Sequence, residues 1–172
     1  MTDQSLLANI AVNNTDAEGR ILAVEKLADQ TLLAKIAVED SDAGVRLAAA
    51  GKLTDQTLLA KIAVEDGDAG VRLTAAGKLT NQPLLARIAV EDPDAGVRLA
   101  AAGTLTDREL LRRVAAEGKD ATVSRYAFSK VAPVAKPADC FAPPPYTTTH
   151  LESINGKLIP VVTTITHTCP QN

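Results

Sequence analysis

Four side chains near the C-terminal end are of the types that bind transition metals. The chain has two cysteines and two histidines, and all four lie between residues 140 and 169. Two thiolates and two imidazoles could complete a tetrahedral zinc site, although the spacing has no C-x-x-C knuckle. A disulfide between the two cysteines is the rival if the protein is exported, and free thiols are expected in a reducing cytosol. The residues concerned are Cys140, His150, His167 and Cys169.

Carboxylates recur at a fixed interval and could attract a basic partner or weakly bound divalent cations. Glutamate and aspartate are adjacent at 39–40, 65–66 and 91–92. A solvated edge that keeps an Ala/Leu-rich protein in solution explains the same pattern. A lysine or arginine precedes each glutamate by four residues, so pairing within one helix is the simplest account of these cations.

Signatures of catalysis are missing from the sequence. It has no G-x-S-x-G, no glycine-rich phosphate loop, no C-x-x-C-H and no histidine before His150. Carboxylates repeated identically on exposed positions give no means of shifting the pKa of one of them. We therefore expect a protein that is not an enzyme and has no cofactor, with zinc in the tail as the alternative.

The elements that carry most of these residues are tandem repeats. Residues 27–52 and 53–78 differ at three positions only, and the same frame fits 79–104, 105–130 and, with more changes, 1–26. Each copy predicts two short helices, the first capped by Asp29 or its equivalent and the second by Asp42. Glycines at 51, 77 and 103 are expected to end the second helix in a left-handed cap. Neighbouring copies must supply each other's core, so we expect an all-α, right-handed α-solenoid of five 26-residue repeats.

An aspartate and an arginine recur four residues apart at the start of the predicted second helix. The spacing allows an ion pair within the helix. Alternatively, the aspartate caps its own helix and the arginine reaches the next repeat, which would form a ladder along the stack. The residues are Asp42 and Arg46, Asp68 and Arg72, and Asp94 and Arg98.

The block D-x-x-V-R-x-x-A-A-x-x-L from Asp42 to Leu53 resembles the second helix of HEAT-like repeats. The short period and the pair Leu32-Leu33 also resemble bacterial leucine-rich variant (LRV-like) repeats. The resemblance covers residues 1–130, although the period is shorter than an ordinary HEAT repeat and no iron–sulfur cysteine cluster precedes it. It implies a scaffold that binds other proteins, or an accessory subunit of a lyase-like enzyme complex.

The repeat pattern stops at residue 130. Residues 131–146 form a proline-rich linker, which cannot continue a helix. Residues 147–172 contain two β-branched runs around Asn155-Gly156, which predicts a β-hairpin. A strand of this kind can add to the sheet of a partner, and we expect contacts through Ile159, Val161 and Ile165.

The two ends of the array differ from its middle. The first copy keeps its apolar residues without a polar cap, and the last carries aromatics in place of small residues. The aromatics either pack under the tail or form an adhesive patch, and a head-to-tail contact between copies would propagate into a ring or filament. The interaction candidates at the ends and in the tail are Leu6, Leu7, Ile10, Tyr126, Phe128, Phe141 and Tyr146.

Composition restricts the partners. A net charge of −3 with no basic stripe argues against nucleic acid. The N-terminus has no basic region followed by an apolar one, and no apolar run is long enough for a membrane span. We expect a cytoplasmic protein–protein interaction scaffold, with export without a signal left open. End-to-end self-assembly would make it a homo-oligomer or filament, and a metal-binding or redox-responsive tail on an inert rod is the alternative.

Overall fold

The computed structural model describes residues 3–131, 146–154 and 157–165, with side chains in the first of these ranges only. The chain divides into two units, residues 1–131 and 132–172, which are described separately. The first unit has ten helices in adjacent pairs: α1 (Gln4–Asn13), α2 (Ala17–Lys26), α3 (Gln30–Glu39), α4 (Ala43–Lys52), α5 (Gln56–Glu65), α6 (Ala69–Ala76), α7 (Gln82–Glu91), α8 (Ala95–Thr104), α9 (Arg108–Glu117) and α10 (Ala121–Val131). This pattern confirms an all-helical tandem-repeat architecture for residues 3–131.

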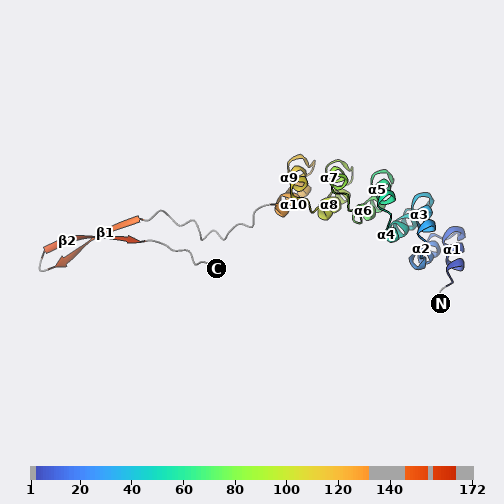
Figure 1. Cartoon of the computed structure of the whole chain (residues 1–172), viewed down its shortest axis with the longest axis horizontal. Coiled ribbons are helices and arrows are strands. Elements are labelled where there is room, and N and C mark those ends of the chain that lie inside the picture. The colour runs from blue at the N-terminus through green and yellow to red at the C-terminus, as the bar shows by residue number, and fades with distance from the viewer. Residues whose placement is uncertain (1–2, 132–145, 155–156, 166–172) are drawn as a thin grey trace. The chain divides into compact units, whose positions relative to one another are not determined.

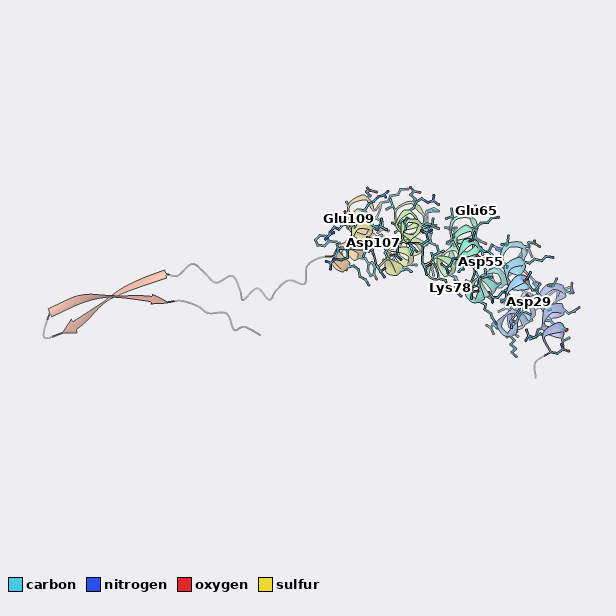
Figure 2. The ribbon with its side chains drawn as sticks, viewed as in Figure 1. Asp29, Asp55, Glu65, Lys78, Asp107 and Glu109 are labelled. Atoms are coloured by element: carbon cyan, nitrogen blue, oxygen red, sulfur yellow. The ribbon has the colours of Figure 1, made fainter. Side chains whose placement is uncertain are left out.

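The odd-numbered helices, here called A helices, begin at the predicted caps. The side chain of Asp29 accepts hydrogen bonds from the backbone N–H groups of Thr31 and Leu32. Asp55 and Asp107 do the same for α5 and α9, and all three are labelled in Figure 2. These bonds satisfy N–H groups that have no partner within the first turn of a helix.

The even-numbered helices, here called B helices, also begin at aspartates, but their predicted glycine ends are wrong. Asp42 accepts from the N–H of Val45. Helix α4 continues through Gly51 to Lys52, and Leu53 follows in an extended conformation with its N–H bonded to Ala50 O. Gly77 does follow the end of α6, with right-handed φ and ψ of −63° and −17°. A buried leucine turns the chain, so no left-handed residue is needed.

The two kinds of helix form two rows in the first unit (Figure 1). Neighbouring B helices pack directly on one another, whereas most neighbouring A helices make few contacts. The reason is side-chain size, because B helices meet through alanines that are fully buried, such as Ala49, Ala75 and Ala101. Buried leucines between the repeats, at 27, 53, 79 and 105, complete the core, each contributing roughly 1.5–3 kcal/mol.

The second unit contains two paired strands, β1 (Tyr146–Ile154) and β2 (Lys157–Ile165). They are antiparallel, with Tyr146 opposite Ile165 and Ile154 opposite Lys157. Of the predicted linker 131–146, Val131 lies in α10 and Tyr146 in β1. The rest of that linker, residues 132–145, and the predicted turn at 155–156 lie outside the described residues.

Candidate protein-interaction surface

Each internal joint between repeats contains an arginine that reaches forward along the array. Arg46 Nε and Nη2 donate to Asp66 Oδ2 and Oδ1 of the next repeat, at 2.9 and 3.0 Å. Its Nη1 donates backward to the carbonyl oxygen of Asp40, at 3.0 Å. The pair within one helix that the spacing also allowed is not formed, because Asp42 caps α4. The rungs of this Arg–Asp ladder are Arg20–Asp40, Arg46–Asp66, Arg72–Asp92 and Arg98–Asp120.

The ladder changes the interpretation of the acidic columns. The side chains of Asp40, Asp66 and Asp92 are only 11%, 9% and 5% exposed, and each is paired with an arginine. An exposed strip made of both glutamates and aspartates is therefore wrong. Their adjacency in sequence hid the fact that one carboxylate of each pair points into the joint and the other points to solvent.

Ion pairing sets the pKa values along the ladder. Burial raises the pKa of Asp66, but the hydrogen bonds from Arg46 and from the N–H of Asp68 outweigh it, so the pKa lies below its ordinary value. The bond to Asp92 likewise raises the pKa of Arg72. Arg46 and Asp66 are both charged at neutral pH, and the bidentate geometry fixes how one repeat is oriented on the next.

The last rung differs from the first three. Gly118 replaces the aspartate, and Arg98 Nη2 bonds to the helix cap Asp120 instead, at 2.8 Å. Within residues 3–131, the Nε of Arg98 is buried without a hydrogen-bond partner. The hydrogen bond from Arg98 lowers the pKa of Asp120. This joint is therefore held by one hydrogen bond between the side chains rather than two.

A second set of bonds, which fastens each A helix to the connection into the next repeat, was not predicted. Gln30 Nε2 donates to Lys52 O at 3.2 Å, and its Oε1 accepts from the N–H of Thr54 at 3.1 Å. Gln56 repeats this arrangement with Lys78 and Thr80. The recurrence of glutamine directly after the A-helix cap was a visible signal. A neutral amide is needed there because it must donate and accept at once.

A row of open clefts lies between successive A helices at their C-terminal ends. The clefts between α1 and α3, α3 and α5, and α5 and α7 have volumes of about 440, 370 and 210 Å³. We call them the groove row. Each is lined by alanine and valine from the preceding A helix and by isoleucine from the next. The valines are Val12, Val38 and Val64, which are 49%, 45% and 43% exposed.

The rim of each groove carries one cation and one glutamate from the following A helix. In the first groove these are Lys35 and Glu39, which lie 3.9 Å apart and are both well exposed. Lys61 and Glu65 occupy the second groove, and Figure 2 labels Glu65 on α5. The paired arginine and aspartate of a ladder rung also line each of the first two grooves, so these grooves have no net charge.

The first repeat lacks the rim pair. Asn9, Asn13 and Asn14 occupy the positions that correspond to Lys35, Glu39 and Asp40. No repeat precedes α1 within the described residues, so these positions line no groove. The charged pair is present on every later A helix, including α9, where Arg113 and Glu117 lie 3.0 Å apart, so pairing within the helix accounts for it.

The predicted interaction residues at the two ends are partly exposed. Leu6 and Ile10 are more exposed than their counterparts at 32 and 36, which the preceding repeat covers, whereas Leu7 is buried. Phe128 is 61% exposed at the position where Ala102 is completely buried. Tyr126 packs partly against the core. We call these surfaces the end faces.

The metal candidates are not brought together in the described part of the chain. Cys140, His167 and Cys169, like Phe141, lie outside it. His150, Tyr146, Ile159, Val161 and Ile165 lie in the strands, where His150 pairs with Val161, but their side chains are not described. Residues 3–131 contain no group of three or more metal-binding side chains.

The chain matches no protein-family model, no curated protein and no solved structure. No helix within the described ranges has the length and apolar content to cross a bilayer. The class is defined by the fold alone, a tandem helical-repeat protein.

Proposed function

We propose that this protein is a non-enzymatic scaffold that binds other proteins, built as a right-handed, HEAT-like solenoid. The observation that supports this best is the groove row, in which three clefts of related lining, each with an exposed valine beside charged residues, recur along one side of the array. Identical sites at regular intervals suit an extended partner that contacts several repeats at once, so weak contacts add together. They are poorly suited to catalysis, which needs one group unlike its neighbours.

The end faces are less suited to continue the array. Suppose that a second copy stacked on the fifth repeat in the same way as the fifth stacks on the fourth. The first residue of that copy would then have to occupy the place of Val131, which is buried. The second copy would meet Phe128, where the internal repeats have alanine. The ladder arginine and aspartate would also be missing from this contact, because Ser124 and Asn14 occupy their positions. These replacements remove the two charges that would otherwise lack a partner.

Panning a displayed random-peptide library against the full chain tests the scaffold proposal. We expect peptides with a shared pattern and dissociation constants in the micromolar range or better. Failure to enrich any pattern over a library panned on bare support would contradict the proposal.

Self-association through the end faces is a second candidate, because Leu6 and Phe128 are exposed there. The charges are also complementary. Repeat 1–26 has four acidic and two basic residues, a balance of −2, and repeat 105–130 has four acidic and six basic residues, a balance of +2. The contact would use a register other than that of the internal joints.

Native mass spectrometry over a range of concentrations tests the second candidate. Self-association would give species above 18.0 kDa that Leu6→Gln and Phe128→Gln together abolish. A monomer at every concentration would contradict it. The zinc-binding or redox-responsive tail and the β-hairpin contact remain proposals, and metal analysis with thiol titration tests the former.

A further inference from the structure

We infer that the solvent-facing side of the B helices binds an extended segment of a partner protein that is apolar in its middle, basic at one end and acidic at the other. This inference rests on the proposed scaffold function and assigns to it a second surface, separate from the groove row. We call this surface the B face. In the second repeat it consists of Gly44, Leu47, Ala48 and Gly51, and the third and fourth repeats present the equivalent residues.

The B face of these three repeats carries no charge. Each repeat contributes two glycines, one leucine and one alanine or threonine. The leucines at 47, 73 and 99 are 40%, 41% and 37% exposed. The solvated side of a helix is normally rich in charged residues, and a row of exposed aliphatic side chains is typical of a contact site.

The lysines at the edge of the B face are engaged elsewhere. Lys52 and Lys78 each donate to a backbone carbonyl oxygen near the C-terminal end of the preceding B helix. A cation at that position offsets the partial negative charge of the helix end. The apolar row itself therefore selects an uncharged part of a ligand.

Glycines at the C-terminal end of the B face indicate close approach by another chain. Gly51 and Gly103 lie inside α4 and α8, where only proline is less favourable than glycine. Neither has a positive φ, and a Cβ at these positions would find its nearest neighbour at 3.9 and 3.6 Å, an ordinary van der Waals contact. The fold therefore does not require glycine there. The missing side chains leave hollows in which an external backbone can approach the helix.

The two ends of the B face carry opposite charges. In the first repeat Glu18 and Glu25 replace the two glycines, and in the fifth Arg125 replaces the leucine, with Lys130 beside it. All four are exposed. Lys26 at the edge of the first B helix reduces the acidic charge without cancelling it. A complementary segment carries basic residues at the end that lies on repeat 1 and acidic residues at the end that lies on repeat 5.

Curvature of the array favours an extended segment. Neighbouring B helices pack directly while most A helices make few contacts, so the B row lies on the inner side of the curve of the first unit (Figure 1). A straight helix laid along this row would meet only part of it. The five packed B helices span four intervals of about 8–10 Å, which an extended chain covers in about ten to twelve residues.

The test uses fluorescent synthetic peptides with a common middle of about ten residues in which leucine and serine alternate. The mixed peptide has two lysines at one end and two glutamates at the other, and the controls have lysines at both ends or glutamates at both ends. Binding to the full chain is measured by fluorescence anisotropy. We expect the mixed peptide to bind at least about fivefold more tightly than either control. A mixed peptide with asparagine in place of leucine should not bind.

Filling the hollows separates a binding role of the glycines from a structural one. Replacing Gly51, Gly77 and Gly103 by Gln should weaken binding of the mixed peptide at least about tenfold. The thermal midpoint should be unchanged or raised, because glutamine is the better helix former. Gly67→Gln is the matched control, since Gly67 lies in the turn between α5 and α6 with no atom within 4 Å of a Cβ. It should leave binding unchanged.

A change of charge at one end should change the preferred ligand. Arg125→Glu together with Lys130→Glu makes both ends of the B face acidic, so the peptide with lysines at both ends should become the tightest ligand. These exposed replacements leave the buried core unaltered, and helical circular dichroism checks this.

The outcomes separate the inference from the proposal on which it rests. No binding of the mixed peptide, equal binding of the three charged peptides, or full binding by the glycine variant would overturn the inference. If the glycine variant loses its helical signal, the charge variant decides, and an unchanged preference would overturn the inference. The scaffold proposal would survive any of these results if library panning still yields ligands.

Discussion

The internal repeats and the two terminal repeats share one frame but differ where a neighbour is missing. The position of the fully buried Ala102 is taken by the exposed Phe128 in the last repeat, and the position of Arg72 by Ser124. In the first repeat Asn14 replaces the ladder aspartate. Ladder residues are thus retained at the first three joints and change where no joint exists, while the last joint, with Gly118 in place of the aspartate, is intermediate. The near-identity of the middle copies preserves joints and grooves together.

Removing an internal rung should have the largest effect. Arg72→Met retains an unbranched aliphatic side chain at this position. It leaves Asp92, whose side chain is 5% exposed, without its cation. Breaking a buried pair in this way typically costs about 3–5 kcal/mol, and we expect a loss in that range in urea denaturation.

Arg98→Met is the matched control at the last joint. Its bond to Asp120 uses a single nitrogen, so we expect a clearly smaller loss. Equal losses from the two variants would show that the terminal joint is as strong as the internal ones.

Exchanging the residues at the position shared by 102 and 128 should have the next largest effect. Ala102→Phe forces a ring into a fully buried site between repeats and should destabilise by about 1–3 kcal/mol or more. Phe128→Ala, at an exposed site, should change stability by no more than about 0.5 kcal/mol. The thermal midpoints of the two variants check this, and similar shifts would mean that the last repeat is covered like the others.

Acid should weaken the internal joints. The pKa of Asp66 is lower folded than unfolded, where it is about 3.9, so its contribution is present above that pH and is lost as pH falls through the folded value. Below about pH 4 we expect the urea concentration at the unfolding midpoint to decrease. The decrease should be less steep in Asp66→Asn. Parallel pH profiles of the urea midpoint for the wild type and the variant would contradict this.

Adding the rim pair to the first repeat should have the smallest effect. Asn9→Lys with Asn13→Glu restores the cation and glutamate on α1, where they would line no groove. We expect stability to change by no more than about 0.5 kcal/mol and peptide affinity to stay the same. Tighter peptide binding would show that the pair acts without a groove.

The sequence predicted the helix pairs because their determinants are local. The A-helix caps at Asp29 and its equivalents follow directly from repeated side chains next to an apolar stripe. The alternation of larger residues on A helices with alanines on B helices was visible too. Its consequence, open clefts beside Val38, depends on how far neighbouring helices separate, which only packing determines.

The ladder was only half predictable. The sequence shows that Arg46 recurs, but the choice between Asp42 and Asp66 as its partner depends on a distance between repeats. Asp40 and Glu39 look alike in the sequence, and only the fold separates the buried carboxylate from the exposed one.

The central claim is that partners bind along the internal joints and not at the ends. The most direct test is to measure the affinity for a long peptide selected by library panning in chains with residues 53–78 deleted, present once or duplicated. Because neighbouring repeats are nearly identical, each change removes or adds one groove and leaves both end faces intact. The account predicts that affinity rises about tenfold with each added groove. An affinity independent of the number of repeats would contradict it.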